Sequence, residues 1–261
     1  MTAEAGRDAL RYVAIGDSLS EGVGDEPWPD GTLRGWTDRL AALLCARHDE
    51  RGVRYANLAV RGYKAAQVRD TQLDAAIAMA PEVVTLTAGM NDILRPRVDF
   101  NELESTLIGL VQPFTLRGSR VIVVPIPDVS RISPVGALLN ERRNRLNSIY
   151  TNLARRHGVL PLTDTTGTVF EDPRAWDADR LHLSALGHER LAYAAAACLG
   201  IPVGVEWLAA PAGAPPARTV RTEAAWWWGY AMPWIGRRLR GKSSGDGRVV
   251  KRPILAPLEQ M

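Results

Sequence analysis

Cysteine is scarce in this chain, and its scarcity excludes a fold built on disulfides. Only two cysteines occur in 261 residues, Cys45 and Cys198, and each sits in an apolar run with helical spacing. Two cysteines do not form a disulfide framework, so we interpret both as small buried hydrophobic side chains. A hydrophobic share of 46% supplies a sizeable core without such cross-links.

Long apolar runs and targeting signals are also missing. No uninterrupted apolar run approaches the roughly 18 residues of a membrane-spanning helix, and residues 1–11 lack the apolar stretch of a secretory signal. We therefore expect a cytoplasmic protein. The sequence contains neither an internal repeat nor a Walker-type phosphate loop, and its histidines and cysteines lack the spacing of metal ligands. We expect no cofactor and no metal.

Charge is unevenly distributed, although the formal net charge is only +3. Residues 226–252 contain seven basic residues against one acidic residue, whereas the first 225 residues carry a slight acidic excess. Trp226, Trp227, Trp228 and Trp234 lie in the same region, after an Ala/Pro/Gly-rich linker at residues 209–216. We therefore divide the chain into a domain at residues 8–205 and a C-terminal extension at residues 206–261.

The extension has two interpretations that the sequence leaves open. In one, the tryptophans pack on the domain surface and the arginines stay solvated, because such a cluster would otherwise expose a large apolar area. In the other, the aromatic side chains enter a membrane interface and the arginines bind anionic lipid, which gives peripheral membrane contact. We expect no nucleic-acid partner, and we expect the extension to be separable from catalysis.

Apolar strands alternate with helices along the first 200 residues. The pattern predicts strands at residues 11–15, 53–58, 83–87, 121–124 and 159–162, and helices at residues 36–48, 65–79, 101–116, 138–156 and 185–199. Continuously apolar strands separated by helices are typical of a parallel sheet covered on both faces. We predict an α/β fold, a three-layer α/β/α sandwich with a parallel, flavodoxin-like sheet of about five strands.

Four short motifs occupy the loops of this predicted sandwich. They are Gly-Asp-Ser-Leu at residues 16–19, a glycine at position 62, Gly-Met-Asn-Asp at residues 89–92 and Asp-Arg-Leu-His at residues 179–182. The first three follow the first three predicted strands, and the last precedes the final helix. Because ligands of such sheets bind at the carboxyl ends of the strands, we expect the four motifs to meet at one rim.

The residue types in these motifs suit nucleophilic catalysis. A serine hydroxyl such as that of Ser18 is a weak nucleophile and needs an adjacent base. Among the four histidines, only His182 follows a carboxylate, Asp179, by three residues within a loop. This spacing lets the carboxylate hold one ring nitrogen while the other faces the serine. Asp177 is a second acidic residue close to His182. The paired carboxylates that a glycosidase needs are absent from the motifs.

Two further residues are candidate donors to an oxyanion. Gly62 offers a backbone N–H that no side chain covers, and the side-chain amide of Asn91 offers another. Each also has a structural interpretation, because glycine and asparagine are common in turns. We interpret Asp17 and Asp92 as structural residues that bond nearby backbone N–H groups and fix the loops of Ser18 and Asn91.

The four motifs in this order resemble the sequence blocks of the SGNH hydrolases, also called GDSL esterases and lipases, over residues 11–199. The resemblance implies that Ser18 is the nucleophile, His182 the base and Asp179 the group that orients it. It also implies an oxyanion hole formed by Ser18, Gly62 and Asn91.

The resemblance implies a serine hydrolase that cleaves a small-molecule or lipid carboxylic ester through an acyl-enzyme. An acyltransferase or a thioesterase would use the same residues, and a catalytically silent protein that docks on membranes is the alternative from another class. One position departs from the family. Arg61 stands where a small residue usually precedes the oxyanion glycine, which leaves the shape of this loop open.

Overall fold

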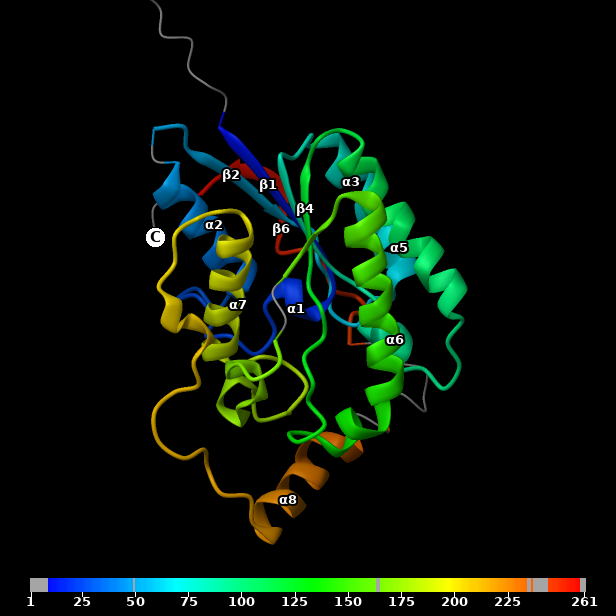
Figure 1. Ribbon diagram of the computed structural model, residues 1–261, viewed down its shortest axis with the longest axis vertical. Helices are drawn as coiled ribbons and strands as arrows, with labels where there is room; N and C mark the ends of the chain where they lie inside the picture. Colours follow the sequence, from blue (N-terminus) through cyan, green and yellow to red (C-terminus); the bar gives the residue numbers. More distant parts are fainter. Residues whose placement is uncertain (1–8, 49, 163–164, 234–235, 237–243, 259–261) are drawn as a thin grey trace, which may run out of the picture.

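The computed structural model describes residues 9–48, 50–162, 165–233, 236 and 244–258, which form a six-stranded sheet between two layers of helices (Figure 1). The strand order is β5-β4-β3-β1-β2-β6. Five of the strands are parallel: β1 (Leu10–Gly16), β2 (Val53–Asn57), β3 (Val83–Thr87), β4 (Arg120–Val123) and β5 (Leu160–Pro161). Their order is that of flavodoxin-like folds, so the predicted α/β sandwich is confirmed.

Two sets of helices cover the faces of this sheet. One face carries α2 (Trp36–Arg47) and α7 (Ala185–Cys198), and the other carries α3 (Ala65–Ala78), α5 (Phe100–Thr115) and α6 (Pro134–His157) (Figure 1). Shorter elements lie in the loops and the C-terminal segment: α1 (Ser18–Glu21), α4 (Met90–Ile93), η1 (Val169–Glu171), η2 (Pro173–Ala175), η3 (Val205–Leu208), α8 (Val220–Trp226) and the π-helical turn η4 (Trp227–Ala231).

Strand β1 shows why the sheet needs continuous apolar runs. Tyr12 and Ala14 point into the core shared with α2 and α7, whereas Val13 and Ile15 point into the core shared with α3, α5 and α6. All four are fully buried. Because successive side chains of a strand alternate between faces, a strand buried on both sides favours apolar residues at successive positions.

The starts of two helices differ from the prediction for local reasons. Helix α5 begins one residue early because Asp99 caps it, with a carboxylate that accepts from the backbone N–H groups of Asn101 and Glu102 at 2.9 and 3.1 Å. Helix α6 begins four residues early, at Pro134, where a proline suits the first helical position because no N–H is needed there. It ends at His157 and is capped by Gly158 in the left-handed conformation.

A sixth strand comes from the C-terminal part of the chain, where the sequence predicted none. Strand β6 (Arg252–Pro257) pairs antiparallel with β2, with Ala256 opposite Tyr55. Its two prolines are tolerated because β6 is an edge strand, where one side needs no hydrogen-bond donors. Just before it, Lys251 Nζ lies 2.6 Å from the buried Asp38 Oδ2 of α2.

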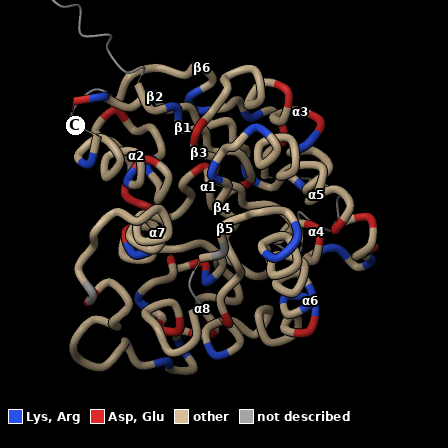
Figure 2. The backbone as a smooth tube through the Cα atoms, turned by 45° about the horizontal axis from the view of Figure 1, so that its top comes forward, with Lys and Arg blue, Asp and Glu red and all other residues tan. Residues whose placement is uncertain are grey.

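Acidic and basic residues are interspersed around the molecule, and the central strands carry few of them (Figure 2). Cys45 and Cys198 are half-buried at the edge of one core rather than fully buried. Within the described ranges, no helix combines the length and apolarity needed to cross a bilayer. Trp234 and the basic residues 237–242 lie outside the described residues. Membrane contact and cytoplasmic location both stay predictions.

Candidate active site

The turn after β1 requires glycine and presents Ser18. Gly16 has a φ of 136°, and a Cβ there would lie 2.3 Å from the backbone oxygen of Thr87. The buried side-chain amide of Gln72 holds this turn, because it accepts from Gly16 N at 2.7 Å and donates to Gly16 O at 2.9 Å. Ser18 follows as the first residue of α1, at the carboxyl end of a central strand.

Asp17 connects this turn to the loop of Asn91. Its buried carboxylate accepts from the Leu19 backbone N–H at 3.3 Å, from Thr87 Oγ1 at 3.1 Å and from Asn91 Nδ2 at 3.2 Å. Burial raises the pKa of Asp17 to about 6, although these donors favour the charged form. The carboxylate therefore fixes the turn of Ser18 and the Asn91 side chain relative to each other.

Asn91 and Asp92 lie in α4, directly after β3. Asn91 is almost fully buried, and the carboxylate of Asp92 accepts from the backbone N–H of Ala65 at 3.0 Å, at the start of α3. Burial raises the pKa of Asp92. Asp92 thus joins two loops of the same rim, which agrees with the structural role predicted for it.

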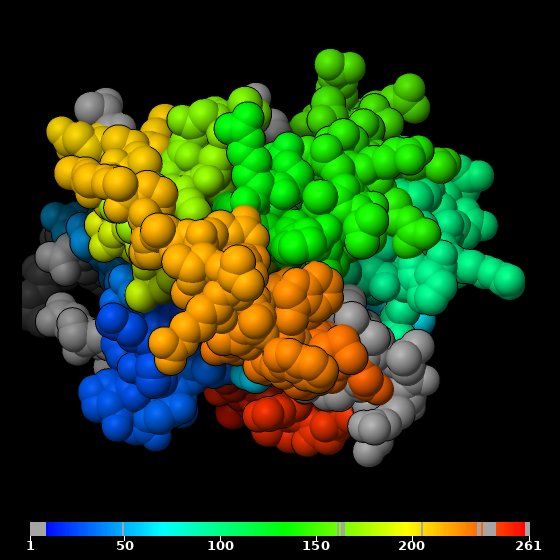
Figure 3. All heavy atoms as spheres, turned by 90° about the horizontal axis from the view of Figure 1, so that it is seen from below, coloured from blue at the N-terminus to red at the C-terminus, as the bar shows by residue number. Residues whose placement is uncertain are grey.

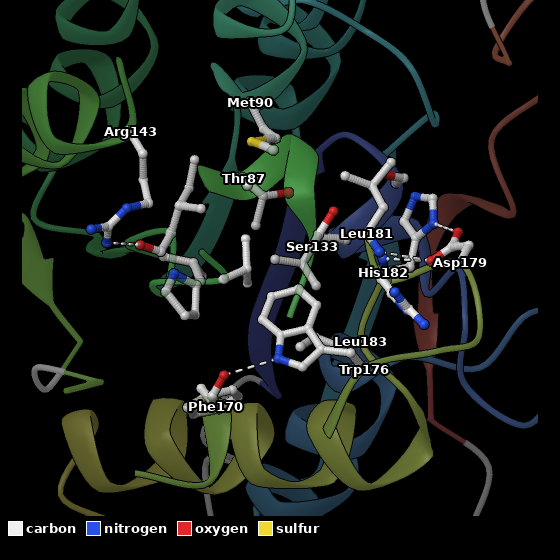
Figure 4. Close-up of a pocket in the computed structure, with 18 of the residues that line it drawn as sticks. Thr87, Met90, Ser133, Arg143, Phe170, Trp176, Asp179, Leu181, His182 and Leu183 are labelled. Carbon is white, nitrogen blue, oxygen red and sulfur yellow. Dashed lines mark hydrogen bonds and ion pairs between the residues drawn. The ribbon is translucent and has the colours of Figure 1, made fainter. Parts of the chain in front are cut away.

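The loop before α7 brings Asp179 and His182 together (Figure 4). Asp179 Oδ1 accepts from the backbone N–H groups of Leu181 and His182, both at 2.9 Å, and Oδ2 lies 2.6 Å from His182 Nδ1. Burial opposes ionisation of Asp179, but the hydrogen bond and charge of His182 outweigh it and hold its pKa below the ordinary value. Asp177 bonds His182 through its backbone, since its N–H donates to the His182 carbonyl.

The histidine in α7 has a structural role instead. His188 is fully buried, its Nδ1 accepts from the Trp36 backbone N–H at 3.1 Å and its Nε2 donates to the Val23 carbonyl at 3.0 Å. Burial lowers its pKa to about 4, so it stays neutral around pH 7. This leaves His182 as the histidine of the site.

The loop of Gly62 is tied to α1 by an ion pair that the sequence did not reveal. Arg61 donates to the buried carboxylate of Glu21 through its backbone N–H at 2.7 Å, and through its guanidinium at 2.9–3.1 Å. Gly62 follows with a φ of 78°, which suits a residue without a side chain. The departure at Arg61 therefore supplies an anchor between this loop and the helix that carries Ser18.

One cavity of about 390 Å³ brings the predicted residues together. Ser18, Gly62, Asn91, Asp179 and His182 all line it. Most of its remaining wall is apolar and includes Val124, Ile126, Val129, Leu139, Phe170, Trp176 and Leu183. A volume in the range of small-molecule sites and an apolar wall beside polar groups suit an ester with an apolar part.

The C-terminal segment contributes a wall that sequence reasoning missed. Trp226, Tyr230, Ala231 and Pro233 line the same cavity. The cluster of tryptophans was the only signal in the sequence, and it did not specify which surface they would cover. Within the described residues, no group of three or more His, Cys, Asp or Glu is arranged to hold a metal ion.

Comparisons with known proteins agree with this architecture. Residues 14–190 match the model of the GDSL-like Lipase/Acylhydrolase family. An acetylxylan esterase from Geobacillus stearothermophilus is 24% identical over 76% of this chain and 95% of its own length. The crystal structure of that organism's acetylxylan esterase Axe2 superposes with a TM-score of 0.58 at 23% identity, over 79% of this chain and 99% of the other.

A second solved structure is LAE5, an alpha/beta hydrolase enzyme from the metagenome of Lake Arreo, Spain. It has a TM-score of 0.62 and 25% identity, over 76% of this chain and 99% of its own. The family match covers more than half of the chain, so this protein belongs to the GDSL-like lipase/acylhydrolase family. Within that family it is a carboxylic ester hydrolase.

Proposed function

We propose that this hydrolase cleaves its ester through an acyl-enzyme on Ser18. The Ser18 hydroxyl attacks the ester carbonyl carbon while His182 Nε2 takes its proton. The imidazolium then gives this proton to the departing alcohol oxygen, and the acyl group stays on Ser18. Water, deprotonated by the same nitrogen, attacks the acyl carbon, and the imidazolium returns the proton to Ser18 Oγ as the bond to the acid breaks.

Asp179 supports both halves of this cycle. Its carboxylate is bonded to His182 Nδ1 and to two backbone N–H groups of its own loop. The Nδ1 bond holds the ring in the tautomer whose Nε2 can accept a proton. Because the pKa of Asp179 is held below its ordinary value, the carboxylate stays charged and stabilises the imidazolium.

The negative charge on the carbonyl oxygen needs donors in the transition state. We assign these to the backbone N–H groups of Ser18 and Gly62 and to Asn91 Nδ2. Asp17 and the Arg61–Glu21 ion pair hold the loops that carry these donors. Donors fixed before the reaction lower the barrier because they need no reorganisation.

The observation that carries this proposal is the convergence of five residues on one cavity. They come from four separate loops, and the Asp179–His182 bond is already formed at 2.6 Å. The acetyl group that the Geobacillus relative removes would fill little of the apolar wall described above. We therefore propose an ester with a larger apolar acyl group as the substrate.

Labelling with a fluorophosphonate tests the nucleophile. The reagent should modify Ser18 in the full chain, and Ser18→Ala should abolish both labelling and ester hydrolysis, with a loss of about 10⁴–10⁶-fold in kcat. Ser133 lines the same cavity, so Ser133→Ala is a matched control that should keep both. Normal turnover by Ser18→Ala, or loss of labelling in Ser133→Ala, would disprove the mechanism.

A further inference from the structure

The C-terminal segment lies against the loop that carries Asp179 and His182. Helix α8 and the turn η4 cross one end of the molecule and contact the segments that precede and begin α6 (Figure 3). The family match ends at residue 190, so these elements lie outside it. Two residues of α8, Glu223 and Trp226, contact this loop at Arg180 and Asp179.

Arg180 stands between Asp179 and Leu181 in an unfavourable backbone conformation. Its φ is 56°, and in the described chain only one other residue besides glycine, Ala80, has a positive φ. A non-glycine residue there is strained and persists only where the surroundings hold it. The residue at the strained position lies two before His182, so whatever holds Arg180 also fixes the loop of His182.

Glu223 of α8 holds the side chain of Arg180. The guanidinium donates two hydrogen bonds to the two oxygens of Glu223, both at 2.8 Å. Arg218 donates to the same carboxylate at 2.7 and 2.9 Å and also to the Arg131 carbonyl at 2.8 Å. Hydrogen bonds from Arg218 and Arg180 hold the pKa of Glu223 well below its ordinary value. Two guanidiniums that each donate two hydrogen bonds fix the orientation of the carboxylate more firmly than a single surface ion pair does.

Trp226 holds the backbone of the same loop. Its indole Nε1 donates to the Asp179 carbonyl at 3.1 Å, and its ring lies 4.8 Å below the guanidinium of Arg180. Trp226 is only 5% exposed, whereas Trp228 in the same segment is 74% exposed. Asp179 is therefore fixed twice, at its carboxylate by His182 and at its carbonyl by Trp226.

We propose that Glu223 and Trp226 are positioning residues of the active site, which hold the Asp179–His182 loop in its working conformation. This inference rests on the proposed function, because it assigns the two residues an effect on the base of that mechanism. It also departs from the expectation that the extension is separable from catalysis. Small displacements of a base from its reacting atoms cost large factors in rate.

Two conservative variants test the proposal in the full chain. Glu223→Gln keeps the size of the side chain but not its charge, and Trp226→Phe removes the indole donor but keeps a ring below Arg180. Each should lower kcat about 10-fold and leave KM within about twofold, measured well below the melting temperature of each variant. Arg221→Gln and Trp228→Phe, at exposed positions of the same segment, are the matched controls and should change kcat less than twofold.

A spectroscopic readout separates positioning from simple docking. The Nδ1 proton of His182 in its bond to Asp179 should give a low-field proton resonance. We expect this resonance to broaden or vanish in Glu223→Gln and Trp226→Phe and to persist in both controls. This readout does not depend on Ser18, so it tests the positioning even if fluorophosphonate fails to label Ser18 and the proposed function falls.

A double-mutant cycle tests whether Glu223 acts through Arg180. Arg180→Gly removes the hydrogen bonds to Glu223. It also removes the backbone strain that these bonds hold in place, because glycine adopts a positive φ without strain. In that background Glu223→Gln should have no further effect on kcat. The proposal is overturned if the effects of Arg180→Gly and Glu223→Gln on kcat multiply. It is also overturned if Glu223→Gln and Trp226→Phe match their controls in kcat and in the resonance. A fall in the melting temperature alone, or a raised KM with unchanged kcat, would overturn it as well.

Discussion

The carboxylate of Asp17 joins two residues of the site that lie far apart in the chain. It caps the turn that presents Ser18 and accepts from Asn91 Nδ2 at 3.2 Å. A buried carboxylate with several donors orients each of them. Asn91 therefore reaches the cavity in a fixed rotamer, which is the condition for a donor that acts mainly in the transition state.

Replacement of Asn91 by alanine should lower kcat by about 10²–10³-fold, because one donor to an oxyanion contributes about 2.7–4 kcal/mol to the barrier. KM should change much less, since the bond strengthens as the charge develops. Steady-state kinetics on one p-nitrophenyl ester measure this difference. Asn101→Ala, at an exposed position of α5, is the control. A raised KM with normal kcat would make Asn91 a ground-state binder instead.

Asp17 should leave a signature in the pH dependence of stability. Its pKa of about 6 in the folded protein lies above the ordinary 3.8, so the folded state binds this proton more tightly than the unfolded state. Its contribution to stability is then fully present below about pH 4 and is lost as the pH rises through about 6. The loss amounts to about 3 kcal/mol.

Denaturant unfolding of the wild type and of Asp17→Asn between pH 4 and pH 7 measures this contribution. The variant has no carboxylate to titrate, so the wild type should lose free energy of unfolding relative to it as the pH rises. Parallel pH profiles for the two proteins would contradict the assignment.

The sequence predicted which residues gather at the candidate site better than the residues that support them. Ser18, Asn91 and His182 could be predicted because each lies in a short motif at a strand end or in a loop. The partners Glu21 of Arg61 and Glu223 of Arg180 could not, because both pairs are distant in sequence, 40 and 43 residues apart. Only the folded chain brings such charges together.

At the scale of elements, the five parallel strands were predictable and β6 was not. A strand buried on both faces is mostly apolar along its length, which is a strong signal. Strand β6 lies at the edge, contains two prolines and leaves Ile254 72% exposed. Neither alternation nor a continuous apolar run marks it, so only pairing with β2 identifies it as a strand.

The ion pair beside β6 predicts how strongly this strand is held. Lys251→Ala should destabilise the protein by about 3–5 kcal/mol, because it leaves the buried carboxylate of Asp38 without its cation. Thermal or denaturant unfolding measures the loss. Asp38→Asn combined with Lys251→Ala should recover part of it, since no buried charge then remains. Equal stability of Lys251→Ala and the wild type would contradict the role of this pair.

At the scale of the whole molecule, the domain and the C-terminal segment enclose the cavity jointly. Residues of the loop between β4 and α6, of the loop before α7 and of η4 meet around Ser18. The space beside Ser18 is therefore set by contacts between parts of the chain more than 200 residues apart. Its apolar wall leads to a prediction about the acyl group.

Hydrolysis of p-nitrophenyl esters should speed up as the acyl chain lengthens from acetate. Each buried methylene contributes about 0.8 kcal/mol, so kcat/KM should rise about fourfold per added carbon until the chain fills the cavity. Leu139 lines the cavity, and Leu139→Trp should narrow it. The acyl chain length that gives the highest kcat/KM should then become shorter, while acetate hydrolysis stays unchanged. A maximum at acetate in the wild type would contradict an apolar acyl pocket.

The antiparallel β6 also determines where the two ends of the described chain lie. Arg11 pairs with Arg54, and Arg54 pairs with Pro257, so β1 and β6 flank β2 and the start of one lies near the end of the other. Neighbouring strands are about 4.8 Å apart, so a short linker could span the roughly 10 Å between them. A circular permutant opened in the exposed linker at residues 209–216 would keep every strand pair. In that topology the segment that holds Arg180 would be the first part of the chain to be synthesised instead of nearly the last.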